Sequence, residues 1–309
     1  MMSQPSEAVR GKHPGSSKIS HSEVSVEGGT LHIARVGSGN PLILLHGWPE
    51  FWFTWEPVML LLAEHFDVIV PDLRGLGDSS KPDGPFTSKQ HAADITAMLN
   101  QLGLAKVGLV SHDVGGAVAQ ALAQAYPARL SGLFFFTFLH PGIGDRFFAL
   151  DRLANIWYMF FQQTAMASDV VTSDTENIAR YFSYFLKEWA HKPECFDDVI
   201  EVFVENFRKP GNVEGGFNYY RAAMPPRTNP PDGKAAPLPP PVLLPTCVRW
   251  SQYDKLFDYA WTDTLPRFFP QLDLKQFESV GHFPHRENPR QAAHYISEFF
   301  RSLHAEGTK

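Results

Sequence analysis

The stretch VGLVSHDVGGA, residues 107–117, runs an apolar strand into small residues and then into a helical pattern. This order is typical of a nucleophile elbow, G-x-S-x-G, in which a sharp turn between strand and helix lifts one side chain above the sheet. Asp113 occupies the central position, where a serine is usual. The stretch therefore predicts an α/β fold whose elbow presents a carboxylate.

A carboxylate nucleophile favours a different electrophile from a serine. It is too weak a base to displace an amine or alkoxide from a carbonyl, and it is suited to displacement at a saturated carbon. The expected electrophile is an alkyl carbon that bears a strained oxygen or a halide. Asp113 could instead serve only as a helix N-cap, which is a position that Asp favours. Three further motifs in the order that an elbow fold requires speak against that alternative.

Composition narrows the class of protein. The 309 residues, 44% of them hydrophobic, fit one catalytic domain with an insertion or two small domains. A formal charge of -6 without a Lys/Arg run predicts no binding to nucleic acid or anionic lipid. The apolar run at 134–139 is too short to span a bilayer and suits a strand buried on both faces.

The expected compartment is the cytoplasm. The first twenty residues contain no apolar stretch, so neither a signal peptide nor a membrane anchor is expected. The two cysteines, Cys195 and Cys247, have no metal-ligand spacing, although a disulfide between them stays open.

From about residue 30, short apolar strands alternate with helical segments. This pattern predicts a mostly parallel sheet with helices on both faces. The expected strands cover 31–36, 41–45, 67–71, 107–111, 130–138, 242–250 and 273–279. Helices are expected at 88–102, 117–125 and 289–303.

Between about 141 and 225 the strand signals stop, and aromatic-rich helical segments take over at 152–163, 175–189 and 196–207. This change predicts a helical cap inserted into the sheet. A proline-rich stretch at 225–245 is expected to be a stiff connector back to the sheet. The predicted organisation is a flexible tail at 1–20, a first core part at 21–140, the cap at 141–225 and a second core part at 226–309.

The remaining catalytic groups can be expected from chain order. An alkyl ester on a carboxylate needs a base that activates water, an acidic group that orients the base, and donors for the oxyanion. His282, in ESVGHFP at 278–284, follows the last expected strand, where the order nucleophile, acid, histidine puts the base. Asp254 follows the strand before it and is the expected acid, with Asp258 as a spare. The chain has thirteen histidines, and His282 is chosen among them because it follows the last expected strand.

Backbone N–H groups are the expected oxyanion donors. One is that of Val114, directly after the nucleophile, and the other is that of Trp48, in LHGWPE at 45–50. The alternative for this second segment is a plain turn that joins a strand to a helix.

Taken together, these motifs resemble the epoxide hydrolases of the α/β-hydrolase superfamily, in particular their bacterial soluble branch. HGWPE at 46–50, DLRGLGDS at 72–79, SHD at 111–113 and GHF at 281–283 extend the resemblance over most of residues 30–300. The first two motifs also occur in dehalogenases and in serine members. The resemblance implies an α/β-hydrolase fold with a helical cap, a covalent ester on Asp113, and a vicinal diol as product, with no cofactor and no metal.

Two cap segments bring the resemblance closer to epoxide hydrolases. GGFNYYRA at 215–222 resembles the segment from which bacterial members supply one ring-opening tyrosine, just before the arginine, which is Tyr220 here. WYMFFQQ at 157–163 resembles the segment of the other tyrosine, which falls on Tyr158 or, with a slip of one residue, on Trp157. Two neutral phenols suit ring opening, because they can bind the epoxide oxygen and donate a proton. Trp157 and Tyr219 are taken as further substrate-binding residues, and the alternative is that cap tyrosines only line an apolar pocket.

Other classes of function remain as alternatives. A dehalogenase could use the same Asp-His-Asp machinery, but 114–117 supply neither the tryptophan nor the arginines of the known halide sites, which leaves the indoles of Trp48 and Trp157. A non-catalytic binding protein of the same fold is the third class. The Phe, Trp and Met content of the cap predicts an apolar or aromatic epoxide, with water as co-substrate. The sequence leaves monomer or homodimer open.

Overall fold

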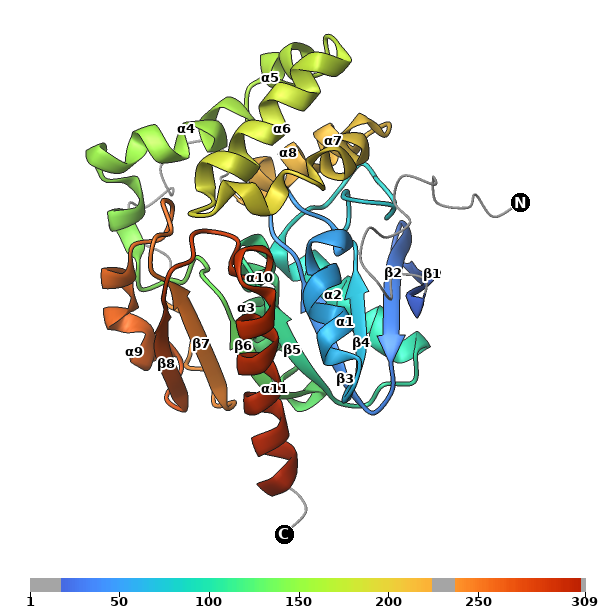
Figure 1. Cartoon of the computed structure of the whole chain (residues 1–309), viewed down its shortest axis with the longest axis vertical. Helices are drawn as coiled ribbons and strands as arrows, with labels where there is room; N and C mark the ends of the chain where they lie inside the picture. Colours follow the sequence, from blue (N-terminus) through green and yellow to red (C-terminus); the bar gives the residue numbers. More distant parts are fainter. Residues whose placement is uncertain (1–17, 224–236, 307–309) are drawn as a thin grey trace.

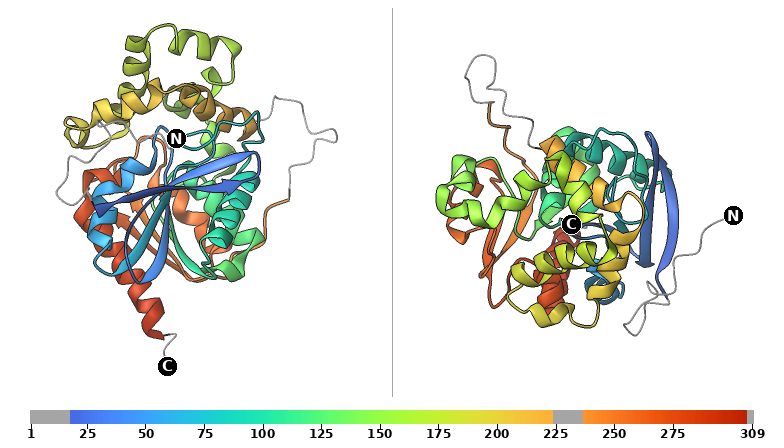
Figure 2. Two further views of the ribbon diagram at one scale, coloured as in Figure 1. Left: turned by 90° about the vertical axis from the view of Figure 1, so that its right-hand side faces the viewer. Right: turned by 90° about the horizontal axis from the view of Figure 1, so that it is seen from above.

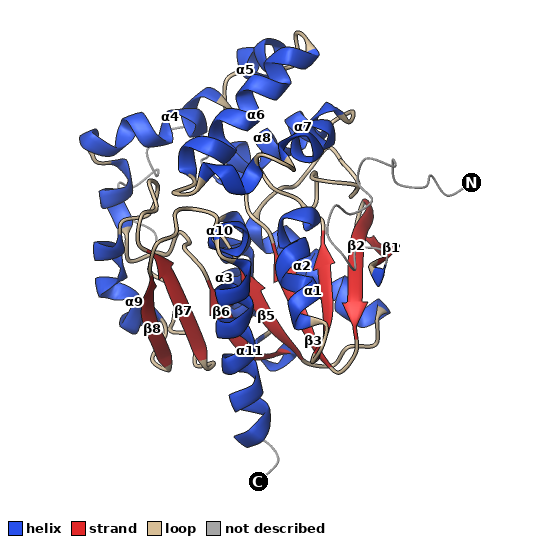
Figure 3. Cartoon of the chain, viewed as in Figure 1, coloured by secondary structure: helices blue, strands red, loops and turns tan. Residues whose placement is uncertain are grey.

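The structure is a computed structural model that describes residues 18–223 and 237–306. Its eight strands form one sheet in the order β1-β2-β4-β3-β5-β6-β7-β8 (Figures 1 and 3). β2 is antiparallel to both β1 and β4, and the remaining neighbours are parallel. The strands are β1 (Ser20–Val26), β2 (Gly29–Gly37), β3 (Asn40–Leu45), β4 (Phe66–Pro71), β5 (Val107–Ser111), β6 (Leu130–Phe135), β7 (Thr246–Ser251) and β8 (Leu272–Phe277).

Helices cover both faces of the sheet (Figure 2). On one face α1 (Glu56–Leu62) packs against α11 (Pro289–Glu306), and on the other α2 (Ser88–Gln101) packs against α3 (Val114–Ala125). Because both faces are covered, all five residues of β5 are buried, which explains its unbroken run of small and apolar residues. Two single-turn helices, α9 (Leu265–Phe268) and α10 (Pro284–Glu287), precede β8 and α11.

A separate group of helices, which we call the cap, lies across the carboxyl ends of the parallel strands (Figure 1). It is inserted between β6 and β7 and consists of α4 (Leu153–Phe161), α5 (Ala165–Val171), α6 (Thr175–Trp189), α7 (Ile200–Arg208) and α8 (Asn212–Ala223). In α6, the side chain of Asp174 accepts a hydrogen bond from the Asn177 N–H and caps the first turn. The buried residues of α6 recur every three or four positions, so they form one stripe: Ile178, Phe182, Phe185, Leu186 and Trp189.

Two strand predictions differ from the structure by more than two residues, and one strand was not predicted. β6 was expected to run through Phe138 but ends at Phe135, because the carbonyl of Thr137 accepts the Asp113 N–H at 2.9 Å instead of continuing the ladder. β7 was expected from residue 242 but starts at Thr246, directly after Pro245, which has no N–H to donate to a ladder. β1 was not predicted, because in SHSEVSV only Val24 is buried and no apolar alternation is visible.

The ends of the predicted organisation fall partly outside the described residues. The expected tail at 1–20 is described only from residue 18, and Ser20 already pairs with Arg35 in the sheet. Residues 225–236 of the expected proline-rich connector also lie outside the described ranges. The boundaries 21–140, 141–225 and 226–309 stay predictions. Across 18–223 and 237–306, we find no helix that combines the length and the apolar character needed to cross a membrane.

Candidate active site

Asp113 occupies a strained turn between β5 and α3. Its φ of 50° and ψ of -121° lie in a region that residues with a side chain rarely adopt. The chain packs tightly around this turn. A Cβ atom at Gly47 would lie 2.6 Å from Cβ of Asp113, and one at Gly115 would lie 2.7 Å from the carbonyl oxygen of His46. The two glycines are therefore required for the close approach of the β3 loop to the elbow.

The two carboxylate oxygens of Asp113 have different surroundings. Oδ1 accepts a hydrogen bond from the backbone N–H of Trp48 at 2.9 Å, whereas Oδ2 lies 3.8 Å from Nε2 of His282. The N–H of Val114 belongs to the first turn of α3, where backbone donors have no intrahelical acceptor. The oxygen held by Trp48 is therefore distinct from the oxygen that faces the histidine.

His282 and Asp254 form a buried pair. The Nδ1–H group of His282 donates to Oδ2 of Asp254 at 2.9 Å, and both side chains are fully buried. Burial disfavours the imidazolium, but the charge and hydrogen bond of Asp254 and the charge of Asp113 outweigh it and raise the pKa of His282 to about 9. Burial also opposes the charge of Asp254, yet His282 holds the pKa of Asp254 below its usual value. Asp258, the spare acid, instead caps the 3-10 helix η8 (Tyr259–Thr264).

Tyr158 of α4 and Tyr220 of α8 meet above the β3 loop. Their ring centroids are 5.5 Å apart at 88°. The indole of Trp48 stacks on Tyr158 at 5.2 Å and meets Tyr220 edge-on at 5.5 Å. Burial, together with the negative charge of Asp113, raises the pKa of both phenols well above the usual value. Both therefore remain neutral and able to donate a proton.

Comparison with known proteins decides the family. Residues 40–289 match the model of the α/β-hydrolase fold. The chain is 31% identical over 296 residues to a soluble epoxide hydrolase of Corynebacterium sp. (strain C12), and the match covers 93% of this chain and 99% of the relative. The protein belongs to the epoxide hydrolase family of α/β hydrolases.

Further similarities agree with this family. The chain is 32% identical over 235 residues to an epoxide hydrolase 2 of Siraitia grosvenorii. The match covers 66% of this chain and 73% of the relative. The ligand-free structure of the epoxide hydrolase CorEH superposes with a TM-score of 0.80 at 29% identity, over 92% of this chain and 99% of that one.

Two other expected substrate-binding residues, Trp157 and Tyr219, have different surroundings from the pair of Tyr158 and Tyr220. Trp157 is 40% exposed, and its ring contacts Phe161 and Phe185. The ring of Tyr219 lies 6.2 Å from that of His91 in α2 and meets that of Tyr220 edge-on at 5.4 Å. Neighbouring residues of a helix differ in direction by about 100°, so neither can share the orientation of Tyr158 or Tyr220. The substrate-binding role expected of Trp157 and Tyr219 stays a prediction.

A second buried polar group of this α/β hydrolase was not predicted. Glu50 accepts hydrogen bonds from the Gly47 N–H at 2.8 Å and the Thr54 hydroxyl at 2.6 Å. Its carboxylate also lies 2.9 Å from Nδ1 of His112 and 2.8 Å from Nε2 of His285. Burial opposes the charge of Glu50, but the two histidines outweigh it and keep the pKa of Glu50 well below its usual range.

His112 connects this group to the pair of His282 and Asp254. Nε2 of His112 lies 2.7 Å from the carbonyl oxygen of His282, which can only accept, so Nε2 carries a proton. Nδ1 of the same ring lies 2.9 Å from Oε2 of Glu50. His285 stays neutral, because burial lowers its pKa to about 4. Each member adjoins a sequence motif, but 62 and 235 residues separate Glu50 from its partners, and no local signal links them.

Two groups of described residues have the composition of a metal site. One is Glu50, His112 and His285, and the other is His32, Asp72 and Asp78. In the first group, the atoms that face one another are joined by direct hydrogen bonds. In the second, Nζ of Lys209 lies 2.5 Å from Asp78 and already supplies a positive charge. We therefore assign no metal to either group.

Proposed function

We propose that this protein is an epoxide hydrolase that converts an apolar or aromatic epoxide and water to a vicinal diol. The observation that carries the proposal is the buried, edge-on pair of Tyr158 and Tyr220, whose neighbour Trp48 also binds the carboxylate of Asp113. Phenols that stay neutral beside a carboxylate suit a reaction that opens a C–O bond and must protonate the oxygen released. Relatives named epoxide hydrolases support the same activity.

In the first step, Oδ2 of Asp113 attacks a carbon of the epoxide ring. The C–O bond breaks, its electron pair passes to the oxygen, and Tyr158 or Tyr220 donates a proton to that oxygen. Oδ1 keeps its hydrogen bond to the Trp48 N–H and becomes the carbonyl oxygen of a hydroxyalkyl ester. The phenolate left behind is a strong base in this buried position, and it regains a proton that originates from His282.

Formation of the ester also prepares the base for the second step. The charge of Asp113 is one cause of the raised pKa of His282, and esterification removes that charge. The now neutral His282, oriented by Asp254, takes a proton from water, whose oxygen attacks Cγ of Asp113. The Trp48 and Val114 N–H groups bind the oxyanion on Oδ1. Its collapse breaks the ester bond, and the departing alkoxide takes the proton from His282. The diol leaves, and the proton left on the carboxyl group of Asp113 passes to His282, which restores the resting charges.

The surroundings of these groups favour an apolar substrate. The rings of Trp189 and Phe257 lie 5.2 and 5.8 Å from the ring of His282, and Phe185 lies 5.2 Å from Tyr158. Aromatic faces of this kind bind apolar or aromatic groups better than charged ones. We therefore expect styrene oxide to be a better substrate than a charged epoxide.

The arrangement of the indoles disfavours the dehalogenase alternative. A halide leaving from a carbon at Asp113 would need N–H donors directed at that carbon. The edge of Trp48 that carries Nε1 instead packs against α8, where a Cβ atom on Gly216 would lie 2.9 Å from Nε1. Trp157 is directed away from Tyr158 and is partly exposed.

The deciding experiment is a single turnover in ¹⁸O water with enzyme in excess of styrene oxide. If the ester forms on Asp113, the first diol takes its oxygen from the carboxylate and is unlabelled, while the peptide that contains Asp113 gains ¹⁸O. Label in the first diol would contradict the covalent route. The Asp113→Asn variant is the control and should form no diol.

A parallel assay with 1-chlorobutane and fluoroacetate separates the alternatives. Halide release without diol formation would replace the proposal with a dehalogenase. Thermal stabilisation by an epoxide without any turnover would favour a binding protein.

A further inference from the structure

The backbone on both sides of His282 is held by one carboxylate, that of Glu287 at the end of α10. Its Oε2 accepts a hydrogen bond from the N–H of Gly281 at 2.9 Å, and its Oε1 accepts one from the N–H of Phe283 at 3.1 Å. Glu287 is buried, with 8% of its surface exposed. Residues 281–283, which we call the base loop, are therefore fixed before and after the histidine by the same side chain.

The same carboxylate also binds the cap. Oε2 accepts the backbone N–H groups of His191 and Lys192, each at 3.0 Å. These two residues belong to the stretch 189–192 at the end of α6, which we call the cap segment. Glu287 is thus a shared acceptor that joins the base loop of the core to the cap segment.

Direct contacts between core and cap lie beside this shared acceptor. The N–H of His282 donates to the carbonyl oxygen of Trp189 in the cap segment at 3.0 Å. The ring of His191 stacks on that of Tyr253, the neighbour of Asp254, at 4.2 Å. The cap segment therefore touches both the loop of the expected base and the loop of the acid that orients it.

An ionised carboxylate suits the position of Glu287. All four of its partners are N–H donors, and a carboxylate offers acceptors alone, whereas an amide would direct an N–H group at another donor. Burial raises the pKa of Glu287, and the four N–H groups oppose that rise. Buried N–H groups that lose their acceptor must find another, so loss of the carboxylate would let the base loop and the cap segment shift.

We propose that Glu287 is a positioning residue for His282 in the second step of the proposed reaction. Nδ1 of His282 is bound to Asp254, so the place of Nε2 depends on the backbone of the base loop, which Glu287 fixes. A displacement of about 1 Å in a catalytic group can cost about 10²-fold in rate.

The first step does not depend on this link. The ring-opening tyrosines lie on α4 and α8 and pack on the indole of Trp48. Loss of Glu287 should therefore act on water attack and spare ring opening. The inference rests on the proposed two-step hydrolysis of an epoxide.

Glu287→Gln tests this role, because it keeps the size of the side chain and replaces one acceptor by a donor. We expect hydrolysis of the ester to slow by about 10–100-fold and ester formation to keep its rate, so the variant should accumulate the mass of one styrene oxide. Rapid mixing, acid quenching and mass spectrometry measure both rates. Equal slowing of both steps, or no change in either, would overturn the proposal.

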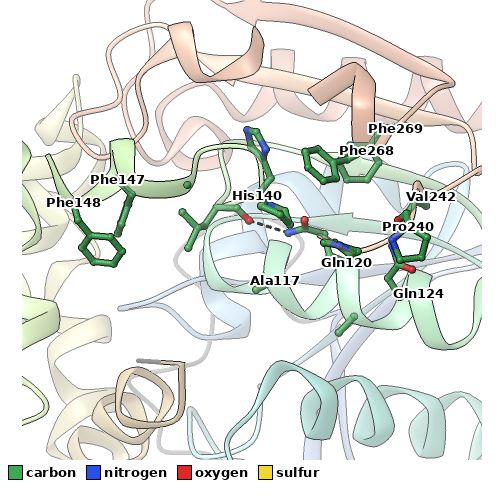
Figure 4. Close-up of a pocket in the computed structure, with 15 residues that line it drawn as sticks. Ala117, Gln120, Gln124, His140, Phe147, Phe148, Pro240, Val242, Phe268 and Phe269 are labelled. Carbon is green, nitrogen blue, oxygen red and sulfur yellow. Dashed lines mark hydrogen bonds between the residues drawn. The ribbon is translucent and has the colours of Figure 1, made fainter. Parts of the chain in front are cut away.

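A matched control lies at the other connection between core and cap. Gln120 of α3 donates to the carbonyl oxygens of Gly116 at 3.1 Å and Leu139 at 2.9 Å, on the wall of a cavity of about 490 Å³ (Figure 4). Leu139 belongs to the chain that leads from β6 to the cap. Gln120→Glu exchanges amide and carboxylate in the opposite direction and also disrupts bonds to the backbone, but the base loop does not line this cavity. Both rates should stay normal in this variant.

Glu287→Asp separates positioning from a general loss of structure. It keeps the charge and both acceptor oxygens on a side chain that is one methylene shorter, so hydrolysis of the ester should proceed at a rate between those of the unmodified protein and Glu287→Gln. All variants are compared below their unfolding temperatures. Normal hydrolysis in a Glu287 variant that is merely less stable would overturn the proposal.

The imidazole N–H between His282 and Asp254 provides a measurement that needs no turnover. In protein labelled with ¹⁵N-histidine, its proton resonates far downfield, and His282→Gln identifies the signal by its loss. Glu287→Gln should shift or broaden this resonance, and Gln120→Glu should leave it in place. An unchanged resonance would overturn the role of Glu287, whereas failure of the unmodified protein to form ester and diol would overturn the proposed function instead.

Discussion

Nε2 of His282 lies 3.8 Å from Oδ2 of Asp113, while Nδ1 of the same ring is bound to Asp254 at 2.9 Å. The imidazole thus lies between two carboxylates, which explains why its charged form prevails in a fully buried position. In the resting protein, the residue expected to act as a base is protonated. It becomes a base only when one of the two carboxylates loses its charge.

The raised pKa of His282 predicts a loss of stability in alkaline solution. Its pKa is about 9 in the folded protein and 6.5 in the unfolded chain, so its contribution is complete below pH 6.5 and is lost as the pH rises through 9. The loss amounts to about 3 kcal/mol of the free energy of unfolding. Urea unfolding between pH 6 and 10 measures it. His282→Gln should show a flatter profile, and equally steep profiles would contradict the assignment.

Removal of either hydroxyl of the tyrosine pair should slow ring opening. Tyr158→Phe and Tyr220→Phe should each lower the rate of ester formation by about 10²-fold, because the oxygen loses a hydrogen bond and a proton donor. Rapid mixing with styrene oxide, followed by mass spectrometry of the acid-quenched protein, gives this rate. Tyr184→Phe, at an exposed position of α6, is the matched control and should react at the normal rate.

Loss of the acidic partner should stop the reaction at the ester. Asp254→Asn removes the charge that orients and supports His282, so water attack should slow by about 10²–10⁴-fold. Ester formation needs Asp113 and the phenols, so the variant should gain the mass of one substrate and retain it. The control is Asp258→Asn, which alters only the cap of η8 and should turn over. A variant Asp254→Asn that never gains mass would argue against this division of roles.

Glu50 is expected to be important for stability. Glu50→Gln changes a buried carboxylate that accepts hydrogen bonds from Gly47 and Thr54 and lies against His112, and a buried polar group left without its partner costs about 1–3 kcal/mol. Equilibrium unfolding in urea measures the loss. Glu64→Gln, on the surface, should change stability by less than about 0.5 kcal/mol. Similar small effects in both variants would show that the buried hydrogen bonds of Glu50 contribute little to stability.

The local sequence pattern predicted those strands and helices whose residues are buried either throughout or at regular intervals. β5 has apolar or small residues throughout and is buried at all positions, and α6 combines an Asp174 cap with a regular buried stripe, so both were found with their observed bounds. β1 could not be found in this way, because backbone pairing with β2 holds it in place more than burial of its side chains.

The residues of the candidate site also differ in whether the local sequence could predict them. Chain order and motif position were enough to nominate Asp113, Asp254 and His282, since each follows a strand whose carboxyl end meets the same edge of the sheet. The choice between Trp157 and Tyr158 needed the orientation of α4, which a short motif does not fix. The Glu50 group needed three distant loops to meet, and only the folded chain brings them together.

The backbone of Trp48 lies in the loop after β3, whereas its ring packs among side chains of the cap helices. Its indole is surrounded by the rings of Tyr158, Tyr181, Phe182, Phe185, Trp189 and Tyr220. Lifting the cap would wet this apolar surface, so the movement carries a positive heat-capacity change. Wherever cap movement limits turnover, an Arrhenius plot of the rate would therefore be curved, and the curvature would measure how much of the aromatic surface around Trp48 becomes wet.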